Sequence, residues 1–202
     1  MGRKSLLTVA LAIIVAGRAS AQTIGTPIYH SPYRSFRTSE LGGYISDPGA
    51  GISVAIQGEY RIARPKFDAG LTVGYADGAG NSRNLFGFGV DGRVPIAKHT
   101  QSFPLDASFT GAFGALFGGG KVGFIVPLGV SLGRQILLEG SSMSFTPYVN
   151  PVVAPTFGDL LGDVQFGLGL GVDLAITKTF DLRVSGSLGD IEGVGIGAAW
   201  HH

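Results

Sequence analysis

The chain has 202 residues and a formal net charge of +1, and only 14% of its residues are Asp, Glu, Lys or Arg, against about 25% in a typical soluble domain. It contains 34 glycines and no cysteine, which excludes a disulfide framework and a zinc–thiolate site. The near-neutral charge without a basic cluster argues against a nucleic-acid partner.

The N-terminus has the pattern of a secretory signal peptide. A basic start at residues 2–4 precedes an apolar run at 6–16 and the small residues Ala19-Ser20-Ala21. The run is too short to anchor in a bilayer, so we expect residues 1–21 to be removed on export. Residues 22–35 show no periodicity and hold two prolines, which predicts a flexible leader in which His30 is solvated and binds no metal.

From residue 36 to residue 200 apolar residues alternate with small or polar ones, the pattern of β-strands with two different faces. Ten stretches show it, near 36–45, 52–62, 67–75, 86–96, 105–117, 122–132, 145–154, 163–177, 182–188 and 194–200. Pro127 interrupts one stretch, and the stretch at 145–154 carries Pro147 and Pro151. Proline removes a donor from the strand ladder, so these two are the least regular.

The clearest strand is the glycine-rich stretch at 163–177. One face carries Phe166, Leu168, Leu170 and Val172 among other apolar residues, and the opposite face is small or polar. About 9–11 residues suffice for a tilted membrane strand. We therefore expect the apolar face to contact lipid, and residues such as Gln165, Gly169 and Asp173 to face a lumen.

The lysines support a membrane location for these strands. Lys66, Lys98, Lys121 and Lys178 all fall at turns between the alternating stretches. A lipid-facing surface excludes them, since Lys or Arg at the midplane of a barrel costs about 2–4 kcal/mol. Open sheet edges cannot be satisfied in hydrocarbon, so the strands must close. The sequence predicts an all-β, antiparallel, up-and-down barrel at 36–200, with about ten strands and eight as the alternative.

The predicted inward face carries charges of both signs, and two interpretations remain open. They either form ion pairs that fill a narrow barrel or a charged constriction in a pore. The residues are Glu59, Arg61, Asp68, Asp91, Arg93, Asp106, Asp173, Asp181 and Arg183. Many other inward residues are small, which leaves room for a narrow water path.

The pattern as a whole resembles small bacterial outer-membrane β-barrels of the OmpA and OmpX type. Val194, Ile196, Ala198 and Trp200 resemble the terminal strand that the outer-membrane assembly machinery recognises in that family, although His201 and His202 follow the aromatic residue here. The resemblance implies an integral protein of the outer membrane of a Gram-negative-type bacterium, with lipid and the assembly machinery as partners and no cofactor.

An outer-membrane lipid hydrolase is the rival class of protein. Such an enzyme needs a His with a nucleophile or a carboxylate at the barrel rim. The mature chain offers only His30, His99 and the terminal pair, without a G-x-S-x-G motif or a zinc-type His spacing. The sequence therefore favours a non-enzymatic envelope protein with at most a narrow pore, and a porin-like channel for small solutes is the alternative.

Overall fold

The structure is a computed structural model, and it describes residues 26–202 except 50, 81, 161 and 163. The predicted signal peptide at 1–21, leader residues 22–25 and the first residue of the glycine-rich stretch lie outside the described residues. Among the residues that are described, no helix is long and apolar enough to span a membrane.

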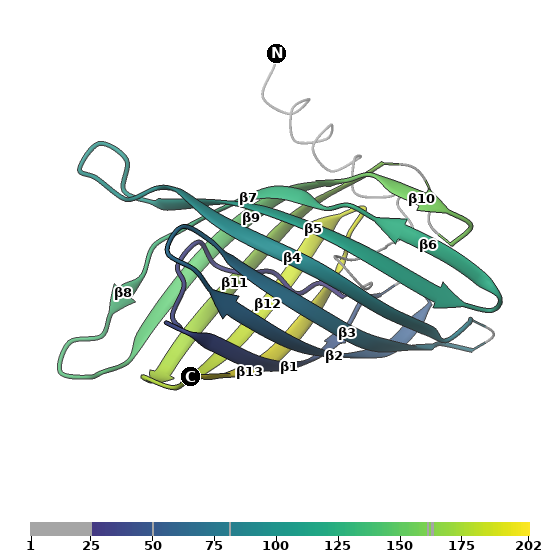
Figure 1. The fold of residues 1–202 in the computed structure, drawn as a ribbon, viewed down its shortest axis with the longest axis horizontal. Helices are drawn as coiled ribbons and strands as arrows, with labels where there is room; N and C mark the ends of the chain where they lie inside the picture. The colour runs from purple at the N-terminus through teal and green to yellow at the C-terminus, as the bar shows by residue number, and fades with distance from the viewer. Residues whose placement is uncertain (1–25, 50, 81, 161, 163) are drawn as a thin grey trace, which may run out of the picture.

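The described chain forms an all-β closed antiparallel barrel (Figure 1). Its strand segments are β1 Ser39–Asp47, β2 Ile52–Ala63, β3 Asp68–Gly78, β4 Leu85–Ala97, β5 Asp106–Gly118, β6 Lys121–Ile125, β7 Leu128–Gly133, β8 Ile136–Leu137, β9 Ser144–Ala154, β10 Thr156–Gly158, β11 Gln165–Thr177, β12 Phe180–Gly189 and β13 Gly193–His201.

Ten strands make the wall, as the sequence predicts. Each of β1 to β5 pairs with its neighbour, β5 continues the ring to β7, and the ring then runs through β9, β11, β12 and β13 back to β1. Segments β6 and β7 share one wall position because both pair with β5. The alternative of eight strands is wrong, since the first strand and the proline-rich strand are both in the wall.

Proline explains where the wall departs from a regular ladder. The expected strand at 122–132 is divided at Val126 and Pro127 into β6 and β7. Strand β9 stays continuous through Pro147 and Pro151, which face outward. In the pairing of β7 with β9, residues 130 and 131 have no partner. This gap lies beside Pro151, which has no backbone N–H to donate. The first strand begins at Ser39, three residues later than expected.

The outer surface of the barrel is apolar, as predicted. On β11, Phe166 is 61% exposed and Leu168 and Leu170 are each 39% exposed, while Gln165 and Gly169 are buried on the inner face. Aromatic residues meet across the strands near both ends: Trp200 pairs with Phe180 at one end, and Phe86 pairs with Tyr75 and Phe117 at the other. Such belts are typical of barrels in a bilayer.

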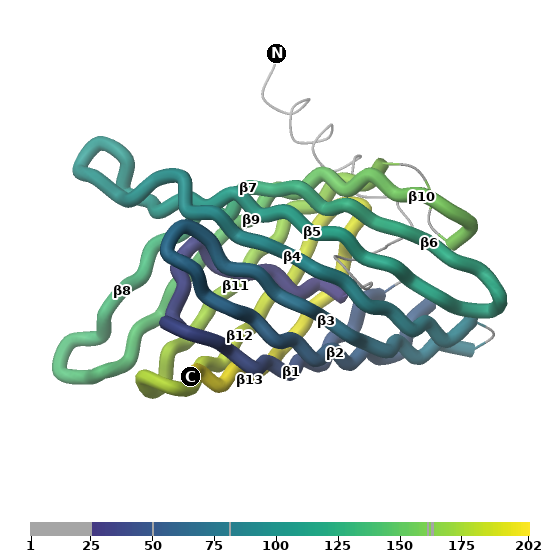
Figure 2. The backbone as a smooth tube through the Cα atoms, viewed as in Figure 1, coloured from purple at the N-terminus to yellow at the C-terminus, as the bar shows by residue number. Residues whose placement is uncertain are grey.

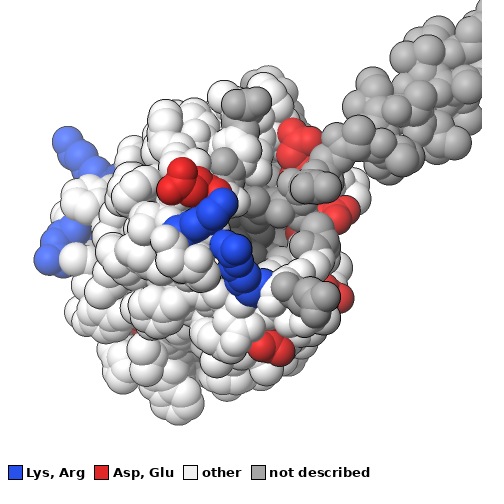
Figure 3. All heavy atoms as spheres, turned by 90° about the vertical axis from the view of Figure 1, so that its right-hand side faces the viewer, with Lys and Arg blue, Asp and Glu red and all other residues white. Residues whose placement is uncertain are grey.

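The two ends of the barrel differ in their connections. The end with the C-terminus, here called the C-terminal end, also holds the β2–β3 and β11–β12 turns (Figure 1). The opposite end holds the β3–β4 and β5–β6 turns. Figure 3 looks onto that opposite end, where charged side chains of both signs gather around the rim and further Lys or Arg side chains project at the left edge of the view.

The lumen contains the chain's own N-terminal segment. Residues 26–36 run inside the barrel and leave it at the C-terminal end, where β1 begins (Figure 2). Thr26, Ile28, Tyr29, Ser31 and Phe36 are all buried. The sequence predicted a flexible leader here and gave no sign that these residues lie in the lumen. We call residues 26–36 the plug segment.

Candidate functional site: a lumen filled by the N-terminal segment

Wall side chains bind the plug segment through its main-chain carbonyls. Ser185 Oγ donates to the carbonyl of Pro27 over 2.7 Å, Tyr148 Oη to that of Tyr29 over 2.8 Å, and Ser131 Oγ to that of His30 over 2.8 Å. Three further carbonyls are bound in the same way, those of Ser31 and Tyr33 by Arg93 Nη1 and that of Pro32 by Ser108 Oγ. These donors come from five of the ten wall strands, so the segment is bound from several sides of the lumen.

Tyr29 is the principal side-chain anchor of the plug segment. It is 1% exposed, and its hydroxyl lies 2.6 Å from Ser187 Oγ. A β-carbon on Gly169 would lie 2.5 Å from Tyr29 Cδ1 and 2.6 Å from Cε1, far inside contact distance. Glycine at this position of β11 therefore makes the space that the tyrosine ring fills.

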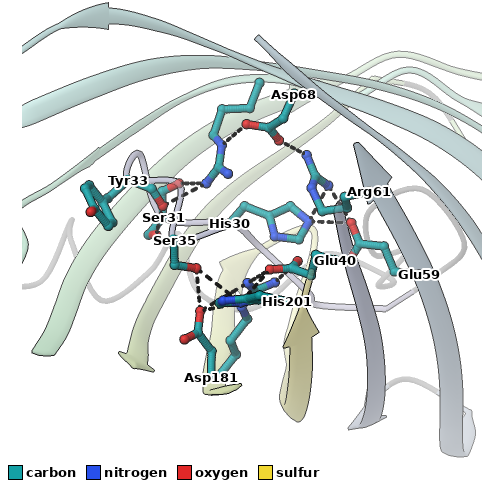
Figure 4. A network of polar contacts seen from close by, with 12 residues as sticks. His30, Ser31, Tyr33, Ser35, Glu40, Glu59, Arg61, Asp68, Asp181 and His201 are labelled. Carbon is teal, nitrogen blue, oxygen red and sulfur yellow. Dashed lines mark hydrogen bonds and ion pairs between the residues drawn. The ribbon is translucent and has the colours of Figure 1, made fainter. Parts of the chain in front are cut away.

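A first ion cluster surrounds Arg61 of β2 (Figure 4). The guanidinium contacts the carboxylates of Glu59, Asp68 and Asp91, and its side chain is 1% exposed. His30 of the plug segment joins the cluster, with Nε2 3.0 Å from Arg61 Nη1 and 3.2 Å from Glu59 Oε1. The histidine side chain is 14% exposed, so the expectation that His30 is solvated is wrong.

Arg93 joins this cluster to the plug segment. Its Nε donates to Asp68 Oδ2 over 2.9 Å, and the same guanidinium binds the carbonyls of Ser31 and Tyr33. Asp68, at the start of β3, thus binds Arg61 of β2 on one side and Arg93 of β4 on the other. One wall cation therefore supports both the ion pairs and the position of the segment.

A second ion cluster lies at the C-terminal end, where β1, β12 and β13 meet. Arg183 binds Glu40 with two nitrogens, and Nη1 also donates to Tyr44 Oη over 2.8 Å. His201 Nε2 lies 3.1 Å from a carboxylate oxygen of Glu40 and 3.1 Å from one of Asp181. Ser35 of the plug segment donates to Asp181 (Figure 4).

The structure places the nine charged residues predicted from the sequence as follows. Seven of them take part in the two clusters: Glu59, Arg61, Asp68, Asp91, Arg93, Asp181 and Arg183. Asp106 instead accepts from the ring of His99 over 3.0 Å in the exposed β4–β5 connection. Asp173 lies opposite Arg183 in the β11–β12 register, but no ion pair among the described residues includes it.

Arginine occupies the positions in the clusters where a metal could bind. The ligand atoms of His30, Glu59 and Asp91 lie within 4.8 Å of one another, as do those of Glu40, Asp181 and His201. Arg61 Nη1 contacts all three members of the first group. Arg183 Nη2 contacts Glu40 and lies 3.6 Å from Asp181 in the second. In both groups an arginine of the chain thus supplies the positive charge that a bound metal ion would bring.

A small cavity lies beside the plug segment. Next to Thr26, Ile28 and His30 it offers about 30 Å³ to the centres of water-sized molecules. One water needs about 10–15 Å³ on this measure, so the cavity has room for two or three waters. The small inward residues Thr72, Thr110 and Ala112 line it, and they help to make the space in which the segment lies.

Three functional features were not found in the sequence. Glu40 lies within the first predicted stretch and His201 one residue beyond the last, and the alternation of these two strands would have placed both on the inner face. The plug segment gave no such signal, because it is bound mostly through carbonyl groups that every residue has. Pro27 and Pro32 alone suggested an extended backbone.

The geometry defines a closed outer-membrane-type barrel with an occupied lumen. Among solved structures, the beta domain of the Bordetella autotransporter Brka is similar in fold, with a TM-score of 0.55 and 12% identity over 81% of this chain and 99% of that one. A bacterial polysaccharide outer membrane secretin matches with a TM-score of 0.47 and 12% identity over 74% of this chain and 56% of that one. No protein-family model and no curated protein sequence matches the chain.

Proposed function

We propose that the chain is an integral, non-enzymatic protein of the outer membrane of a Gram-negative-type bacterium, closed by its own plug segment. The observation that carries this proposal is the plug segment itself, whose six bound carbonyls and buried Tyr29 fill the lumen. The cavity beside it has room for two or three waters, and we expect the segment to interrupt any water path through the lumen. The protein would then be a structural part of the envelope that does not conduct solutes.

The proposed surroundings follow from the outer surface and the last strand. Outer-membrane lipid would cover the apolar flank, on which Leu170 and Ile196 are 39% and 57% exposed. Val194, Ile196, Ala198 and Trp200 remain the proposed signal for the assembly machinery, and Trp200 is 53% exposed at the C-terminal end. The similarity to OmpA- and OmpX-type barrels stays part of this proposal; the ten strands here exceed the roughly eight of those barrels.

The absence of enzymatic activity is supported by where the histidines lie. His30 contacts Glu59 in the first ion cluster, and His201 contacts Glu40 in the second. An arginine binds each of these carboxylates as well. His99 contacts Asp106 at the C-terminal rim, and the hydroxyl groups nearest to it in the β4–β5 connection, Thr100 and Ser102, bond to each other over 3.2 Å. Among the described residues, no hydroxyl bonds to the His99 ring. Ser35 Oγ lies 3.4 Å from His201 Nε2, but it donates to Asp181 and so is not activated by the histidine as hydrolysis would need.

Conductance in planar bilayers tests the proposal. The wild type should show only rare, small openings, because the segment blocks the lumen. A steady open channel in the wild type would reject the closed barrel and favour the porin-like alternative. Hydrolysis of phospholipid, lipopolysaccharide or peptide by the purified protein would separately reject the non-enzymatic assignment, and its loss in the His99→Ala variant would place the activity at His99.

A small-solute channel is the second candidate, and the lumen charges favour it if the plug segment leaves. Six inward carboxylates share three arginines in the wall: the carboxylates are Glu40, Glu59, Asp68, Asp91, Asp173 and Asp181, and the arginines are Arg61, Arg93 and Arg183. This excess of negative charge predicts a cation-selective conductance in any state that opens. Reversal potentials in a salt gradient would measure it.

A further inference from the structure

The contacts of the plug segment show how the lumen recognises it. The bound carbonyls belong to residues 27 and 29–33, and the donors are three serine hydroxyls, one tyrosine hydroxyl and one guanidinium. Each donor is a wall side chain, and Ser108 and Ser131 are completely buried. A carbonyl is present whatever the side chain, so these bonds recognise the path of the backbone and its direction more than its sequence.

Tyr29 makes the main apolar side-chain contact of the segment, beside the polar contacts of His30 and Ser35 with the ion clusters. Tyr29 fills the space that Gly169 leaves and bonds to Ser187, and it belongs to a buried apolar cluster with Ile191 and Val152. By contrast, the side chain of Tyr33 emerges from the lumen, and the residue is 40% exposed. The lumen therefore combines a row of carbonyl donors with a single aromatic pocket.

We propose that the lumen is a binding site for an irregular, non-helical polypeptide segment, and that residues 27–33 are the occupant it takes from its own chain. The ligand class is a segment of about seven residues with an aromatic side chain at the third. Binding depends on its carbonyls and on that ring. This inference concerns what the lumen can bind and does not depend on whether the barrel conducts.

The connection between the plug segment and the wall makes the proposal testable in the full chain. Arg37 and Thr38 are exposed between the buried Phe36 and the first wall strand. A protease recognition site inserted between them allows the folded protein to be cut there, so that the segment is held by non-covalent contacts alone. Size-exclusion chromatography in detergent then shows whether the cut segment stays with the barrel.

Exchange with a fluorescent peptide of residues 26–37 measures affinity and selectivity. The cut segment should stay bound and exchange for the peptide, and also for a peptide with alanine at position 33, whose side chain is exposed. The peptide made of D-amino acids should not compete, because its carbonyls are misplaced. A neutral hydrogen bond contributes about 0.5–1.5 kcal/mol, so Ser108→Ala and Ser131→Ala should each weaken binding about 2- to 12-fold.

The control variant and the contrary outcomes are equally specific. Ser53→Ala removes an exposed hydroxyl that bonds only to Asp77, and it should leave peptide affinity unchanged. Loss of the segment on cutting without rebinding of the peptide would overturn the proposal, as would equal competition by the D-peptide or unchanged affinity in the Ser108→Ala/Ser131→Ala variant. Conductance recorded on the same uncut sample reports separately on the closed barrel.

Discussion

Gly169 offers the sharpest test of how the plug segment is held, because a single methyl group should displace it. In Gly169→Ala the new β-carbon would lie 2.5, 2.6 and 2.7 Å from three ring atoms of Tyr29. Strand β11 is paired on both sides at this position, with Asn150 and Ser187, so the wall cannot retreat and the ring must move.

The size of the effect follows from two limits. If the ring shifts within its pocket, overpacking costs about 1–3 kcal/mol. If the ring leaves, the loss approaches the burial of an aromatic side chain of about 150–250 Å², which is about 4–6 kcal/mol at 25 cal/mol per Å² as an upper bound. A value of about 2–4 kcal/mol corresponds to about a 30- to 700-fold increase in the population with a displaced segment.

Single-channel recording measures this population as the open fraction. We expect Gly169→Ala to open far more often than the wild type. Gly58→Ala is the matched control, because its β-carbon would meet only Val73 Cγ2 at 3.8 Å, and it should behave as the wild type. If Gly169→Ala opened no more often than Gly58→Ala, Tyr29 would not be holding the segment and the reasoning would fail.

Three further variants test other parts of the account. Arg93→Ala should lower the free energy of unfolding by about 3–5 kcal/mol through loss of a buried ion pair, and it should make openings more cation-selective. Chemical denaturation measures the first effect, with the exposed Arg64→Ala as the control. Equal stability of the two variants would contradict the prediction. Leu170→Arg should weaken insertion by about 2–4 kcal/mol if it lies near the midplane, as folding into vesicles would show; unimpaired insertion would place that face away from lipid. Trp200→Ala should slow assembly in cells, and a normal rate would remove the argument from the last strand.

The fold was predictable because lipid and lumen impose opposite demands on alternate residues. Every second residue from Phe166 to Leu170 of β11 lies exposed on the apolar outer face, so the sequence carries a period-two signal of the kind that a lipid-facing strand would have. The same alternation placed Arg61 and Arg93 inside the barrel. Closure with ten strands followed from counting such stretches, and Pro127 marked the break between β6 and β7.

The plug segment was not predictable by the same reasoning. It is neither a strand nor a helix, so it has no periodicity, and its bonds use main-chain carbonyls that leave no trace in residue type. His30 illustrates the difficulty: its role depends on Glu59 and Arg61, which are distant in sequence. Asp106 shows the converse, since its place in the alternation suggested the lumen although it lies at the rim beside His99.

The location of the plug segment can be measured directly with cysteine, because the chain has none of its own. Ser31→Cys places a small thiol at a residue that is 1% exposed inside the barrel, and Arg37→Cys places one at the exposed connection. In the folded, reconstituted protein a membrane-impermeant maleimide should label position 37 rapidly and position 31 only after unfolding. Equal labelling of both positions in the folded protein would contradict the central claim that the segment fills the lumen.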